Sequence, residues 1–136
     1  MLTGGCFCTA VRYQVAGRIF TSTFTSTLCH CDLCRRTTGA PCVAWFSVPS
    51  EDLVLLAGTP TRFRSSVHAT RTFCPACGTQ LTFIDDATPG ETDITTCSLD
   101  QPNLVAPQDH TFISEQLAWL KLADALPHYR RSRAEG

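Results

Sequence analysis

Apolar and polar residues alternate over short stretches along most of this sequence, which is the spacing expected of half-buried β-strands. The clearest case is the stretch 11–15, where Val11, Tyr13 and Val15 would share one face. Glycine and proline interrupt the alternation, for example at 58–60 and 88–90, and these residues favour turns. We therefore predict strands over residues 11–15, 20–28, 44–48, 53–56, 61–65, 70–73, 80–84 and 93–98.

Only two segments favour helices. The first follows Asp32, which could cap a short helix over 33–37, and the second covers 115–126 with Ser114 as its cap. The chain is therefore predicted to be mainly β, with short strands in folded-over antiparallel sheets and one or two short helices. Its 136 residues are enough for a single domain, 1–136, in which the polar residues 130–136 are expected to be a frayed tail.

The composition excludes some classes of protein. The chain is 43% apolar and 17% charged and has a net charge of -1 at pH 7, so it lacks the basic excess of a protein that binds nucleic acid. The longest apolar stretches, such as 41–46 and 53–57, are too short to cross a bilayer, and the first residues do not resemble a signal peptide. We expect a cytoplasmic protein with neither a nucleic-acid nor a membrane partner.

Nine cysteines in so small a chain require a choice between disulfides and metal. Seven of them fall into short spacings, and pairs such as Cys-x-Cys and Cys-x-x-Cys suit a soft divalent ion. A reducing cytoplasm would keep these thiols available. We therefore predict that zinc, not a disulfide framework, is bound by the seven cysteines, which are Cys6, Cys8, Cys29, Cys31, Cys34, Cys74 and Cys77.

The first group combines Cys6 and Cys8 with Cys74 and Cys77, which follow much later in the chain. Four thiolates complete a tetrahedral structural zinc site, which would tie these two distant segments together. Gly78 directly after Cys77 suits a knuckle, in which the chain turns sharply at a residue free to adopt positive φ. The alternative is a redox dithiol made of the later pair.

The second group, Cys29, Cys31 and Cys34, lies within six residues and has only three closely spaced thiols. A zinc ion there would keep an open position, which is typical of a reactive site. The fourth ligand could be water, a substrate thiolate or a histidine, or one of two further cysteines. Those cysteines, Cys42 and Cys97, are otherwise expected to be small buried residues.

Polar residues near the second group provide further candidates. Arg35 and Arg36 follow it directly and could bind a carboxylate, such as those of glutathione, or could be solvated surface charges. His30, between two ligands, is expected to point away from the metal in an extended segment and to form hydrogen bonds. Asp100 and His110 are candidates for proton transfer, although an aspartate before Gln-Pro more often stabilises a turn.

Taken together, these motifs closely resemble the glutathione-dependent formaldehyde-activating enzyme family, which includes the centromere protein V-like proteins. The resemblance extends over nearly the whole chain. The matching residues are Gly5-Cys6-Phe7-Cys8 with Tyr13, Cys29-His30-Cys31-Asp32-Leu33-Cys34-Arg35-Arg36, Gly39-Ala40-Pro41, Ser65-Ser66, Arg71-Thr72-Phe73-Cys74-Pro75-Ala76-Cys77-Gly78-Thr79, Ser98-Leu99-Asp100-Gln101-Pro102, His110, Trp119 and Leu126-Pro127-His128-Tyr129.

The resemblance implies a β-tent fold with a tightly bound zinc at the first group and a looser zinc at the second. It also implies a carbon–sulfur lyase or synthase, similar to S-(hydroxymethyl)glutathione synthase, that acts on glutathione and formaldehyde. Cys29, Cys31 and Cys34 would be the catalytic residues, either by holding a Lewis-acidic zinc or by supplying a nucleophilic thiolate. The alternative function is a non-enzymatic zinc-binding module for a protein partner or a carried thiol, which a closed site with Cys42 as fourth ligand would favour.

Overall fold

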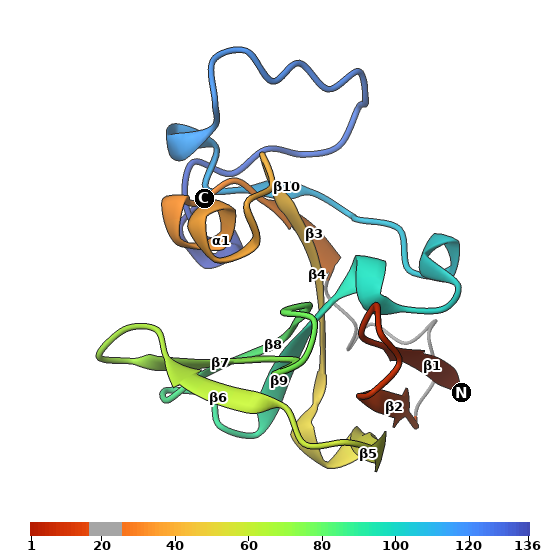
Figure 1. The fold of residues 1–136 in the computed structure, drawn as a ribbon. Coiled ribbons are helices and arrows are strands. Elements are labelled where there is room, and N and C mark those ends of the chain that lie inside the picture. The colour runs from red at the N-terminus through yellow and green to blue at the C-terminus, as the bar shows by residue number, and fades with distance from the viewer. Residues whose placement is uncertain (17–25) are drawn as a thin grey trace.

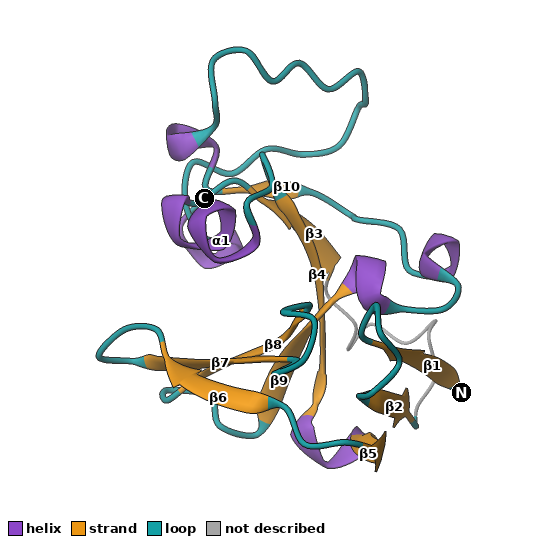
Figure 2. Cartoon of the chain, in the orientation of Figure 1, coloured by secondary structure: helices purple, strands orange, loops and turns teal. Residues whose placement is uncertain are grey.

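The computed structural model describes residues 1–16 and 26–136, and the strands of this part of the chain form two sheets (Figures 1 and 2). The smaller sheet has the order β1-β2-β5 and is antiparallel throughout. Its strands are β1 (Leu2–Gly5), β2 (Arg12–Val15) and β5 (Leu53–Ala57).

The larger sheet has seven strands in the order β10-β3-β4-β9-β8-β7-β6. Only β10 and β3 pair in parallel, and the other neighbours are antiparallel. The two sheets, and a single α-helix among residues 1–16 and 26–136, confirm the prediction of a mainly β protein. The strands are β3 (Ser26–Cys29), β4 (Val43–Pro49), β6 (Thr61–Arg64), β7 (Ala69–Phe73), β8 (Gln80–Asp85), β9 (Glu91–Thr95) and β10 (His110–Thr111).

The helix predicted after Asp32 is present as α1 (Asp32–Thr38), but its cap differs from the prediction. Asp32 is the first helical residue, and the sulfur of Cys31 accepts from the N–H of Cys34 at the cap position. The helix ends at Gly39, which adopts φ 71° and donates its N–H to the carbonyl of Arg35. In Figure 1, α1 lies beside β3 and β10, above the β6–β9 end of the sheet.

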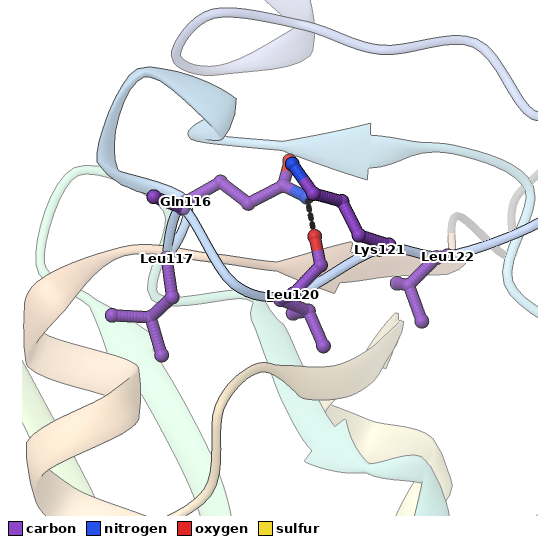
Figure 3. A pocket seen from close by; sticks show the side chains of 6 residues that line it. Gln116, Leu117, Leu120, Lys121 and Leu122 are labelled. Atoms are coloured by element: carbon purple, nitrogen blue, oxygen red, sulfur yellow. Dashed lines mark hydrogen bonds between the residues drawn. The ribbon is translucent and has the colours of Figure 1, made fainter.

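The helix predicted over 115–126 is absent. A short 3-10 turn, Ile113–Glu115, is followed by a loop in which the Gln116 side chain donates to the carbonyl of Leu120 (Figure 3). A twelve-residue helix needs a packed apolar face to be stable, whereas most of this segment is exposed, including Trp119 at 69%. The other 3-10 turns are Ser50–Asp52, Thr96–Ser98, Pro102–Leu104 and Arg133–Glu135.

Most predicted strands are present with shifted ends. The strand predicted over 93–98 stops at Thr95 because the chain turns into a 3-10 helix, and the strand predicted over 20–28 lies partly outside the described residues. The short strands β1 and β10 were not predicted. Residues 130–136, for which we expected fraying, make contacts, since the Arg133 guanidinium pairs with the buried Asp109 at 2.5 Å.

Two apolar clusters form the core, and each contains cysteines from one group. The larger cluster includes Cys6 and Cys74, and the smaller includes Cys29 and Cys34 beside Trp45. All nine cysteines are free thiols, so no disulfide stabilises the fold. Among the described residues, no helix is long and apolar enough to cross a membrane.

Candidate metal centres

The structure brings the four cysteines of the first group together, as the spacing predicted. Their sulfur atoms all lie within 4.8 Å of one another. The Cys6 and Cys8 sulfurs are 3.6 Å apart, and those of Cys8 and Cys74 are 3.7 Å apart. Zinc–sulfur bonds of about 2.3 Å place the sulfurs of a tetrahedral site about 3.8 Å apart, so the four thiols fit zinc.

Two tight turns present these thiols. Gly78 adopts φ 80°, as expected for the knuckle after Cys77, and its N–H donates to the carbonyl of Cys74. The turn after Cys8 uses Thr9 instead, at φ 68°. Thr79, for which the sequence predicted no role, connects the two turns because its hydroxyl accepts from the N–H of Phe7 and contacts the Cys77 sulfur.

The environment of the first group favours the thiolate, the form that binds metal, at Cys6 and Cys77. At Cys8 a backbone hydrogen bond with Ala10 lowers the pKa, but contacts with the other three thiols and burial raise it to about 11 overall. Burial would raise the pKa of Cys6, but a hydrogen bond from the Val11 N–H and contacts with neighbouring thiols lower it overall. Hydrogen bonds with the side chain and backbone of Thr79 lower the pKa of Cys77 to about 5. Both donor chemistry and spacing therefore suit a soft cation.

The structure also brings together Cys29, Cys31 and Cys34, whose sulfur atoms lie within 4.8 Å of one another. Cys29 ends β3, Cys31 caps α1 and Cys34 lies in its first turn. Cys29 and Cys34 are buried, at 6% and 5% exposed, and Cys31 is partly buried. Three thiols in this arrangement fit a zinc ion with one further coordination position.

Arg71, on β7, supplies a positive charge to the second group. It is 3% exposed, and its terminal nitrogen lies 3.7 Å from the Cys34 sulfur. The guanidinium carbon also lies 4.9 Å from the ring centre of Phe83 and 5.8 Å from that of Trp45. The sequence shows that Arg71 is close to Cys74 along the chain, but it does not predict the contact with Cys34. That contact forms only because the folded sheet brings β7 close to α1.

The three thiols differ in their readiness to ionise. Contacts with Cys29 and Cys31, followed by the charge and hydrogen bond of Arg71, lower the pKa of Cys34 to about 3. Contacts with Cys31 and Cys34, followed by burial, raise the pKa of Cys29. Cys34 therefore ionises more readily than Cys29.

Cys42 and Cys97 are not members of either cluster of sulfur atoms. Both line a cavity of about 700 Å³ between the knuckles of the first group and the segment joining α1 to β4. The α1 wall includes Thr38, whose hydroxyl donates to the carbonyl of Cys34. The cavity is large enough for a small organic ligand.

The two arginines after the second group have different surroundings. Arg35 donates to the carbonyls of His30 and Glu115, so its side chain links α1 to two other backbone segments. Arg36 pairs with Asp32 at 3.0 Å and is 79% exposed. Only Arg36 thus presents its side chain mainly to solvent.

The two candidates for proton transfer, Asp100 and His110, already form hydrogen bonds with other side chains. Asp100 accepts from Arg12 and Thr3, and these hydrogen bonds lower its pKa to about 2, so it remains an ionised acceptor. His30 is not a member of the cysteine cluster, and it forms a hydrogen bond as expected, with its Nε2 2.9 Å from Nδ1 of His110. Burial lowers the pKa of His30, which favours the neutral ring.

Comparisons with known proteins agree with this geometry. The family model of the glutathione-dependent formaldehyde-activating enzyme matches residues 1–115, which include both cysteine groups. The fold is similar to the crystal structure of a Rhodobacter sphaeroides structural-genomics target, with 21% sequence identity and a TM-score of 0.59. The match covers 93% of this chain and 98% of that one, and at this identity it concerns the fold alone.

Proposed function

Because this chain belongs to the glutathione-dependent formaldehyde-activating enzyme family, we propose that it is a zinc-dependent carbon–sulfur lyase or synthase. Its substrates would be a small thiol such as glutathione and a small aldehyde such as formaldehyde. We further propose that residues 1–136 form one domain and that the protein works in a reducing compartment such as the cytoplasm, where its free thiols persist.

The proposal assigns different roles to the two cysteine groups. Cys6, Cys8, Cys74 and Cys77 would hold a structural zinc, because four thiols at tetrahedral spacing close the coordination shell. Cys29, Cys31 and Cys34 would hold the reactive zinc. The observation that carries this assignment is that the second group has two buried thiols, one partly buried thiol and no fourth cysteine among its clustered sulfurs.

The reaction itself joins or separates sulfur and carbon. In the forward direction, the thiol sulfur forms a bond with the aldehyde carbon, and the thiol proton ends on the aldehyde oxygen. The reverse reaction breaks that bond and restores thiol and aldehyde. A zinc ion bound at the second group would supply Lewis acidity for the incoming thiol or the aldehyde oxygen.

The chain's own residues would prepare this chemistry. Arg71 offsets the negative charge of Cys34, so that three thiols can approach a cation together. The exposed guanidinium of Arg36 is available for a carboxylate of the thiol substrate.

The test compares Cys34→Ala with Cys42→Ala, which removes a cysteine outside both clusters. NMR would follow the exchange between the free substrates, glutathione and formaldehyde, and the adduct that they form. Native mass spectrometry would count the zinc ions per chain. We expect the wild type and Cys42→Ala to accelerate exchange over the buffer rate and Cys34→Ala to lose that acceleration and one zinc. Equal exchange rates in buffer and wild type would refute catalysis and favour a binding module.

A further inference from the structure

Three side chains outside the cysteine groups converge at the edge of the larger sheet. His110 lies on β10, while Asp124 and His128 belong to the segment that returns to this strand. One potential ligand atom from each lies within 4.8 Å of the others. His110 Nε2 is 3.0 and 3.1 Å from the two oxygens of Asp124, and its ring centre is 4.6 Å from that of His128.

We propose that His110, Asp124 and His128 form a third metal site, which binds a borderline divalent ion such as Zn²⁺. Two imidazoles and a carboxylate are a ligand set that zinc accepts, with bonds of about 2.0–2.2 Å. In a tetrahedral complex such bonds place neighbouring ligand atoms about 3.3 Å apart, close to the separation of His110 and Asp124. Small movements of the two outer side chains would complete the site.

The buried side of His110 supports ligation by its outer nitrogen. A histidine that binds metal through one ring nitrogen usually donates the N–H of the other to an acceptor, which fixes the tautomer. Nδ1 of His110 has such a partner in Nε2 of His30, at 2.9 Å, and both rings are almost fully buried. When His110 donates to His30, its Nε2 lone pair faces the Asp124 carboxylate, and a cation between them resolves the repulsion.

Backbone hydrogen bonds hold the three residues in place. The N–H of His110 donates to the carbonyl of Pro127, and the N–H of Tyr129 donates to the carbonyl of His110, both at 2.8 Å. His128 is therefore fixed beside β10. Asp124 is oriented by the N–H of Leu126, which donates to its Oδ1 at 3.0 Å.

The site would connect the end of the chain to the second cysteine group. His110 pairs across the sheet with Leu28, next to Cys29, and its ring contacts His30. Nitrogen and oxygen ligands bind zinc less tightly than several thiolates, so this ion would exchange more readily than those at the cysteines. The inference stands apart from the proposed reaction.

The experiment titrates ZnCl₂ into full-length protein whose cysteine groups have already been loaded, with histidines labelled with ¹⁵N. Asp124→Asn/His128→Gln changes only side chains that lie largely at the surface, and His68→Gln, at an exposed histidine elsewhere, is the matched control. We expect zinc to shift the ring nitrogen signals of His110 and His128 in the wild type. The His68→Gln variant should behave in the same way.

The double variant should bind one equivalent of zinc less than the wild type. Any shift of its His110 signals should need a zinc concentration at least about tenfold higher. The inference is overturned if the His110 and His128 signals do not move with zinc, or if the double variant binds as much zinc as His68→Gln. Amide spectra establish that each variant is folded. Because no step measures lyase activity, failure of this site and failure of the reaction are separate outcomes.

Discussion

Replacing Arg71 by methionine tests whether this buried cation stabilises the thiolate of the second group. Methionine keeps most of the apolar stem that packs in the core but removes the guanidinium. The Nε of Arg71 has no hydrogen-bond partner among the described residues, so its removal leaves no protein group there unpaired. The main losses are the contact with the Cys34 sulfur at 3.7 Å, a long hydrogen bond to the Thr37 hydroxyl at 3.4 Å, and the attraction to the rings of Trp45 and Phe83.

The expected magnitude follows from that distance. Unit charges 3.7 Å apart attract by about 4.5 kcal/mol at an effective dielectric constant of 20. Part of this attraction is offset by desolvation, and hydrogen bonds to charged groups contribute about 1.5–3 kcal/mol net. Taking about 2 kcal/mol, we expect zinc at Cys29, Cys31 and Cys34 to bind about 30-fold more weakly.

The assay is competition with a chromophoric chelator, which releases zinc from the weaker site first. Arg71→Lys keeps the charge but loses the planar fork and should fall between the wild type and Arg71→Met. Arg62→Met, at an exposed arginine of β6, is the control. If Arg71→Met folds and the zinc affinities of its two cysteine groups match those of Arg62→Met, then Arg71 does not have the electrostatic role assigned to it.

Two further predictions concern stability. Gly39→Ala places a Cβ at φ 71° with no atom within 4 Å, so only backbone strain opposes the substitution. Urea unfolding should show a free energy of unfolding lower by about 1 kcal/mol, and a stabilised variant would contradict the left-handed cap. Burial raises the pKa of Asp93 from 3.8 to about 6, despite a hydrogen bond from Ser47. The folded state therefore binds the extra proton, and stability should fall as pH rises from about 4 through 6. Asp93→Asn should remove this slope and be more stable by about 1–3 kcal/mol at pH 7, whereas thermal melts with the wild-type slope would refute the assignment.

The sequence was informative about elements whose stability comes from local patterns. Alternation located most strands of both sheets, Gly78 marked a turn that needs positive φ, and the glycine and proline at 58–60 marked the turn between β5 and β6. The helix over 115–126 was wrong because propensity alone cannot stabilise a segment that no other element covers. The two-residue strand β10 escaped prediction because its pairing partners are supplied by distant parts of the chain.

The candidate metal centres divide in the same way. Short cysteine spacings identified all seven clustered thiols, because the Cys-x-Cys and Cys-x-x-Cys pairs are local. The pairing of His30 with His110 and the position of Arg71 depend on which strands become neighbours. No spacing along the chain encodes those contacts.

The long sequence separation within the first cysteine group has a consequence for protein synthesis. Cys8 and Cys74 are 66 residues apart, and ribosomes add about 5–20 residues per second, so roughly 3–13 s pass between their appearances. During that interval a nascent chain carries Cys6 and Cys8 without their partners. If this group binds zinc as proposed, all four thiols can hold the ion only late in biogenesis, and oxidation of the early pair before that moment would prevent the site from assembling.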